Sequence, residues 1–125
     1  MPTTILIADD SSTMRCLVRD ALEADAHHVI EAVDGRAALV TAEATPADLV
    51  ITDVNMPEMD GIALVRALRA DPRYRFTPIL VLTTEGGDAM KQKGREAGAT
   101  GWLVKPFDAA RLRQTVLQVL KKRRS

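Results

Sequence analysis

The sequence predicts an α/β fold in which one parallel sheet carries helices on both faces. Five short apolar runs alternate with five segments whose apolar residues recur every three or four positions. Strands and helices that alternate in short units give parallel strands joined by right-handed crossovers. A chain of 125 residues with 46% hydrophobic content is enough for one core. We therefore expect a single doubly wound (βα)5 domain over residues 1–125.

The predicted strands are bounded by turn and cap signals. They cover residues 4–8, 28–32, 49–53, 78–83 and 101–104. The first helix is expected after the caps Ser11–Thr13, and the last after Asp108. The three between are expected over residues 36–44, from Ile62 to the Asp71-Pro72 stop, and over residues 89–97 before Gly98.

Composition restricts the partners. Lys plus Arg and Asp plus Glu number 17 each, so no net charge favours nucleic acid or an anionic membrane. The basic ending Lys121–Arg124 is expected to be a solvated tail at a helix C-terminus. No apolar run has membrane-spanning length, and no signal peptide is recognisable.

The single Cys16 is expected to be a small residue in or near the core. We expect a cytoplasmic monomer.

Polar side chains follow four of the predicted strands at their carboxyl ends. They are Asp9 and Asp10 after the first strand, Asp53 at the end of the third, Thr83 at the end of the fourth and Lys105 after the fifth. In a parallel sheet these ends lie on one edge, where open α/β sheets bind ligands. Three neighbouring carboxylates repel one another unless a cation compensates them, and oxygen ligands favour Mg²⁺. Lysine and threonine there would suit a bound phosphoryl group.

At these residues the chain resembles the receiver domains of two-component response regulators, most closely the stand-alone chemotaxis response regulators. The resemblance spans the whole chain, and four motifs in this order carry it. The motifs are ILIADDSSTMR at 5–15, DVNMPEMDG at 53–61, LTTE at 82–85 and AGATGWLVKPF at 97–107. The resemblance implies a flavodoxin-like sheet of strand order 2-1-3-4-5.

The resemblance also implies the roles of the site residues. Asp53 would be the phosphoacceptor, phosphorylated by a histidine kinase or a small phosphodonor. Asp10, Asp53 and the backbone carbonyl of Asn55 would hold Mg²⁺ directly, and Asp9 would act mainly through a water. Lys105 would neutralise charge on the phosphoryl oxygens.

A conformational switch is implied as well. Thr83 would donate a hydrogen bond to the phosphoryl group and draw the following loop inward. Trp102, where the family more often has Tyr or Phe, would then move and reshape the surface of the fourth and fifth helices and the fifth strand. Asn55 and Glu85 stand where the family tunes dephosphorylation, and a cis Lys105–Pro106 peptide is implied.

The function that follows is a phosphorylation-dependent signalling protein rather than an enzyme, expected in chemotaxis. Its target would be the flagellar motor switch, and a phosphatase is a further expected partner. A phosphate sink or phosphorelay intermediate is the alternative within signalling. An aspartyl-phosphate phosphohydrolase is disfavoured, because such enzymes need an acid two places after the nucleophile, where Asn55 stands. A receiver that binds without phosphorylation is disfavoured because all five pocket side chains are present.

Two purely structural interpretations remain open. Asp9 and Asp10 could serve only as helix caps, and Trp102 could serve only in packing. His27-His28 precedes the second strand, so the pair should lie at the opposite edge from Asp53 and cannot be its phosphodonor.

Overall fold

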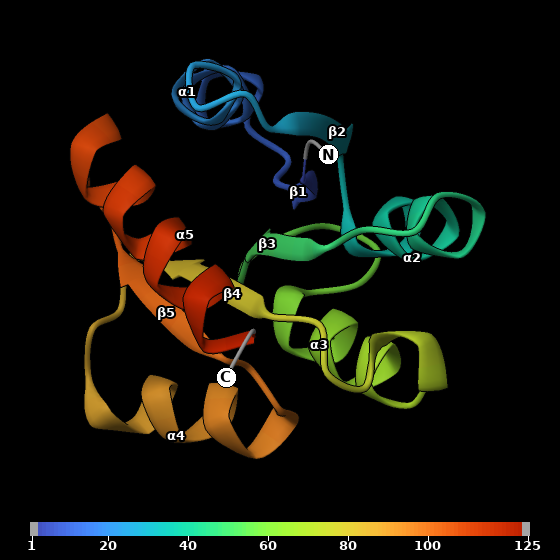
Figure 1. The fold of residues 1–125 in the computed structure, drawn as a ribbon. Coiled ribbons are helices and arrows are strands. Elements are labelled where there is room, and N and C mark those ends of the chain that lie inside the picture. Colours follow the sequence, from blue (N-terminus) through green and yellow to red (C-terminus); the bar gives the residue numbers. More distant parts are fainter. Residues whose placement is uncertain (1–2, 124–125) are drawn as a thin grey trace.

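The five strands form one parallel sheet in the computed structural model, which describes residues 3–123 and the side chains of residues 3–121. The spatial order is β2-β1-β3-β4-β5, as Figure 1 shows. The strands are β1 (Thr4–Ala8), β2 (His28–Ala32), β3 (Leu49–Asp53), β4 (Ile79–Thr83) and β5 (Gly101–Val104). The fold class and the strand order expected from the sequence are confirmed.

Helices cover both faces of this sheet. They are α1 (Ser12–Glu23), α2 (Gly35–Ala44), α3 (Gly61–Arg69), α4 (Asp88–Ala97) and α5 (Ala109–Arg123), with a short 3-10 helix η1 (Pro72–Tyr74) after α3. In Figure 1, α1 and α5 lie on one face and α2, α3 and α4 on the other. Two apolar clusters fill the layers, and the central strands β3 and β4 are buried along their whole length.

Local hydrogen bonds explain where the helices begin and end. Ser11 caps α1, since its hydroxyl accepts from the Met14 N–H at 3.2 Å, and Asp108 accepts from the Arg111 N–H at 2.8 Å before α5. Gly98 ends α4 in the left-handed region with φ 109°, where a side chain would be strained. Helices α2, α3 and α4 each begin one residue before the predicted start, and β4 begins one residue after it.

Cys16 is exposed, so the expected place in or near the core was wrong. The buried residues of α1 are Val18, Ala21 and Leu22. Cys16 precedes Val18 by two positions, which is about 200° around a helix. Its thiol therefore points away from the sheet and lies 3.7 Å from a carboxylate oxygen of Asp20.

The remaining expectations about partners concern the ends of the strands and of the chain. His28 begins β2, at the edge of the sheet opposite to Asp53. Lys121 is exposed, whereas the side chains of residues 122–125 lie outside the described part of the chain. Within residues 3–123, no helix combines the length and the apolar character needed to span a membrane.

Candidate functional site

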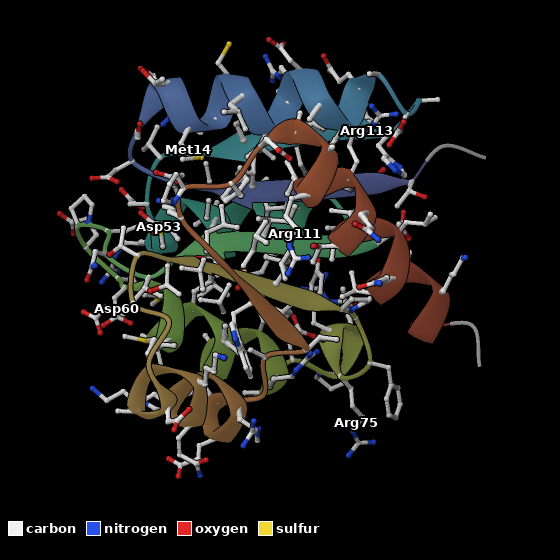
Figure 2. All side chains as sticks on the ribbon, turned by 90° about the vertical axis from the view of Figure 1, so that its left-hand side faces the viewer. Met14, Asp53, Asp60, Arg75, Arg111 and Arg113 are labelled. Carbon is white, nitrogen blue, oxygen red and sulfur yellow. The ribbon has the colours of Figure 1, made fainter. Side chains whose placement is uncertain are left out.

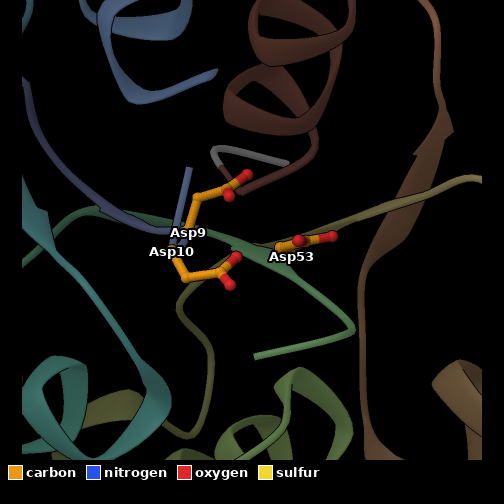
Figure 3. Close-up of side chains that lie close together, drawn as sticks. All are labelled: Asp9, Asp10 and Asp53. Atoms are coloured by element: carbon orange, nitrogen blue, oxygen red, sulfur yellow. The ribbon is translucent and has the colours of Figure 1, made fainter. Parts of the chain in front are cut away.

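Three acidic residues meet at the carboxyl edge of the sheet. Asp9 and Asp10 directly follow β1, and Asp53 is the last residue of the neighbouring strand β3. Figure 2 places Asp53 at the end of the molecule opposite to Arg75, and Figure 3 shows the three carboxylates side by side. One oxygen of each lies within 4.8 Å of the others.

Lys105 supplies the positive charge of this cluster. Its ammonium nitrogen lies 3.1 Å from Asp53 Oδ1 and 3.5 Å from Asp9 Oδ2, so it contacts acids from two strands. The backbone holds it there, because the Lys105 N–H donates to the Thr83 carbonyl at 2.7 Å. The peptide bond to Pro106 is cis, in agreement with the resemblance.

Asp9 is fully buried, and nearly all its polar groups are used in fixing it. Its N–H donates to the Ala32 carbonyl at 3.1 Å, and Oδ1 accepts from the Ser11 N–H at 2.9 Å. Oδ2 accepts no hydrogen bond and lies 3.5 Å from the Lys105 ammonium nitrogen. Burial raises the pKa of this carboxyl; the Ser11 N–H lowers it, the Asp53 charge raises it, and Lys105 lowers it, with a net upward shift.

Asp53 is 9% exposed, and the backbone of the following residue holds its side chain. Its Oδ1 accepts from the Val54 N–H at 2.9 Å. The loop after β3 folds back onto the strand at Gly61, whose N–H donates to the Val54 carbonyl at 2.8 Å. A Cβ on Gly61 would lie 2.0 Å from the Asp53 carbonyl oxygen, so only glycine allows this approach.

The arrangement fits a small divalent cation. Asp9 Oδ2 is a buried acceptor without a donor, and three carboxylates outnumber the single lysine. Oxygen-only donor sets suit Mg²⁺ and similar hard ions. Asn55 is exposed two residues after Asp53, and the role of its carbonyl as a ligand stays a prediction.

The two residues expected to act in a switch lie on neighbouring strands. Thr83 is 3% exposed, and its hydroxyl oxygen accepts from the Glu85 N–H at 2.9 Å. Trp102 lies in β5 opposite Val81, away from the acidic cluster. Trp102 is half-buried. The centroid of its ring lies 5.5 Å from the Lys91 ammonium nitrogen and 5.8 Å from the Arg95 guanidinium carbon, both on α4.

Arg15 contacts this site and is held by Glu31, and sequence reasoning gave neither of them a role. A terminal nitrogen of Arg15 donates to the Asp9 carbonyl at 2.7 Å, and its Nε donates to Glu31 at 3.0 Å. The available signal was a charged residue inside the short strand β2. Its partner was hidden because Arg15 and Glu31 stand 16 positions apart on different elements.

Comparison with known proteins identifies the family. A model of the response regulator receiver domain matches residues 5–117. Chemotaxis protein CheY1 of Helicobacter pylori strain J99 is 40% identical over 118 residues, which are 93% of this chain and 95% of the relative.

Solved structures agree. Chemotaxis response regulator CheY4 of Vibrio cholerae is 44% identical with a TM-score of 0.93, over 95% of this chain and 99% of that one. The receiver domain of sensor histidine kinase PA1611 from Pseudomonas aeruginosa PAO1, solved with a magnesium ion coordinated in the active site cleft, is 26% identical with a TM-score of 0.88, over 97% and 99% of the two chains. This chain therefore belongs to the response regulator receiver domain family, and it is similar to the CheY proteins of chemotaxis.

Proposed function

We propose that this protein is a phosphorylation-activated switch that accepts a phosphoryl group on Asp53 from a histidine kinase and then binds a protein target. One observation carries the proposal. The Lys105 ammonium lies 3.1 Å from Asp53 Oδ1 at an edge where Asp9 and Asp10 also converge. A nearly buried carboxylate with a cation and a candidate metal site beside it suits phosphoryl transfer, in which positioning and electrostatics do most of the catalysis.

In the proposed reaction, an Asp53 oxygen forms a bond to phosphorus while the bond from phosphorus to the donor's histidine nitrogen breaks. Asp10, Asp53 and the Asn55 carbonyl would hold Mg²⁺, with Asp9 acting through a water. The bound ion would supply positive charge toward the phosphoryl oxygens. Lys105 is within reach to contact the same oxygens, since it already touches Asp53. The magnesium ion in the PA1611 receiver domain supports this assignment.

The signal would leave the site through Thr83. Its hydroxyl hydrogen can donate to a phosphoryl oxygen while its oxygen continues to accept from the Glu85 N–H. A phosphoryl group adds about 1.5 to 2 negative charges and three acceptor oxygens, which is enough to reposition a loop. We expect the loop before α4 to move toward Asp53, and Trp102 to change its position against α4.

The proposed output is binding to the flagellar motor switch in chemotaxis. A cavity of about 400 Å³ between α4, β5 and α5 includes Lys91, Trp102, Phe107 and Arg111 in its lining. Aromatic and cationic side chains suit an acidic segment with an apolar anchor. The names of the curated relatives support chemotaxis as the pathway. We place this activity in the cytoplasm, in a monomer that catalyses only its own phosphorylation and dephosphorylation.

Intact-mass spectrometry tests the chemistry directly. With Mg²⁺ and acetyl phosphate, the wild type should gain one phosphoryl group and lose it again with time. Asp53→Asn should gain none. Asp60→Asn is the matched control, because Asp60 caps α3 from the same loop and asparagine caps equally well. Phosphorylation of Asp53→Asn at the wild-type rate would show that the acceptor lies elsewhere.

Lys105→Ala separates phosphorylation from signalling. We expect this variant to accept phosphate and to bind the motor switch protein poorly, because the charge that senses the phosphoryl group is gone. Wild-type target binding by the phosphorylated variant would contradict the switch. A wild type that loses phosphate quickly without binding any motor protein would favour the phosphate sink.

A further inference from the structure

Arg15 spans the peptide bond between the two acidic residues of the site. The carbonyl of Asp9 and the N–H of Asp10 belong to one planar peptide group. A terminal nitrogen of Arg15 donates to that carbonyl at 2.7 Å, a short distance typical of a hydrogen bond from a charged donor. Rotation of this peptide group would move both Asp9 and Asp10, so the contact fixes the turn on which both carboxylates stand.

Arg15 is itself held in place. It lies in the first turn of α1, and helical side chains lean toward the N-terminus, which directs this one back over the end of β1. Its Nε donates to Glu31 in β2 at 3.0 Å, and its side chain is only 16% exposed. The second oxygen of Glu31 pairs with Arg19, one turn further along α1. The guanidinium therefore bridges β2 and the acidic turn.

The geometry points to Arg15 as a positioning residue for the metal site, one that orients Asp9 and Asp10 without touching the ion. This inference rests on the proposed Mg²⁺ site. The anchoring of Asp9 supports it: the Asp9 N–H, carbonyl and Oδ1 are bonded to Ala32, Arg15 and Ser11, so only Oδ2 remains for a ligand. Groups that orient metal ligands from outside typically affect metal affinity about 10- to 100-fold.

The test compares two arginines that share Glu31. Both Arg15 and Arg19 pair with it, but of the two only Arg15 is bonded to the Asp9 carbonyl. Titration calorimetry with MgCl2 should give a dissociation constant about 10-fold higher for Arg15→Met than for the wild type. Arg19→Met removes the other ion pair made by Glu31 of β2, and it should leave the dissociation constant for Mg²⁺ unchanged. Arg15→Lys keeps the charge but replaces the planar guanidinium by a single donor nitrogen, so its dissociation constant should be intermediate.

A second readout needs no metal. In the metal-free protein, the Asp10 amide resonance should shift in Arg15→Met, since its peptide loses the hydrogen bond, and should stay in place in Arg19→Met. Equal loss of Mg²⁺ affinity in both variants, or wild-type affinity in Arg15→Met, would overturn the inference and leave the proposed function intact. If Arg15→Met does not fold, wild-type affinity in Arg15→Lys would overturn it as well. Absence of Mg²⁺ binding by the wild type would overturn the metal site and this inference together.

Discussion

Replacing Asp9 by asparagine should stabilise the metal-free protein and weaken its response to Mg²⁺. At an effective dielectric constant of about 20, each of the two carboxylates within 4.8 Å repels Asp9 by about 3.5 kcal/mol. On the same scale, Lys105 at 3.5 Å attracts it by about 5 kcal/mol. The repulsions exceed the attraction by about 2 kcal/mol. Asparagine removes this excess and still accepts from the Ser11 N–H.

Thermal unfolding with and without Mg²⁺ measures this effect. In EDTA, Asp9→Asn should unfold roughly 5 to 10 °C above the wild type, as expected for about 2 kcal/mol in a domain of this size. Mg²⁺ at ten times its dissociation constant should stabilise the wild type by about 1.4 kcal/mol and the variant by less. A variant less stable than the wild type in EDTA, or equally stabilised by Mg²⁺, would refute the reasoning.

The same pair of proteins should show a defined pH dependence without metal. The pKa of Asp9 is raised in the folded state, chiefly by burial, so the folded protein binds its proton more tightly than the unfolded chain does. Wild-type stability therefore falls as pH rises from the unfolded pKa through the folded one. Asp9→Asn cannot lose this proton, so its advantage should vanish in acid and grow toward neutral pH. Urea unfolding across this range checks the sign.

Two pairs of substitutions to or from glycine give further predictions. Ala26 is exposed with φ 64°, so Ala26→Gly should raise the free energy of unfolding by about 0.5 to 1 kcal/mol. Ala24→Gly, at φ −61°, should lower it by a similar amount, about 0.5 to 1 kcal/mol, and urea unfolding that ranks the two variants the other way would contradict this account. Gly61→Ala should cost about 1 to 3 kcal/mol or more and slow phosphorylation, because its Cβ would meet the Asp53 carbonyl. Gly87→Ala, where a Cβ meets nothing within 4 Å, is the matched control, and equal losses in the two variants would show that the approach at Asp53 is not the cause.

The sequence predicted the fold well because its strands carry strong local signals. The apolar run Leu49–Ile51 is fully buried, as its pattern predicted, and Ser11 and Asp108 mark helix starts by their own hydrogen bonds. The convergence of Asp53 and Lys105 also followed, since parallel strands end at one edge. Cys16 was misplaced because apolar neighbours in the chain are not neighbours around a helix.

What the sequence could not supply are contacts between elements that have no fixed spacing. Nothing in the pattern says that Arg15 reaches the Asp9 carbonyl, or that Glu31 on β2 holds it there. The cations of α4 beside Trp102 are a similar case, because their distance depends on how α4 packs against β5. Such contacts depend on tertiary packing, which periodicity does not encode.

The two sides of the site are built differently, and this indicates where motion should occur. On the β1 side, Asp9 is fixed by hydrogen bonds to three different residues, Ala32, Arg15 and Ser11. On the β4 side, Thr83 bonds to Glu85, two exposed glycines follow, and α4 begins without a side-chain cap. A phosphoryl group on Asp53 would therefore have a well-restrained acidic turn on its β1 side and a less restrained loop on its β4 side. We expect the loop to yield, so that phosphorylation alters α4 and its contacts with Trp102 while the metal site keeps its shape.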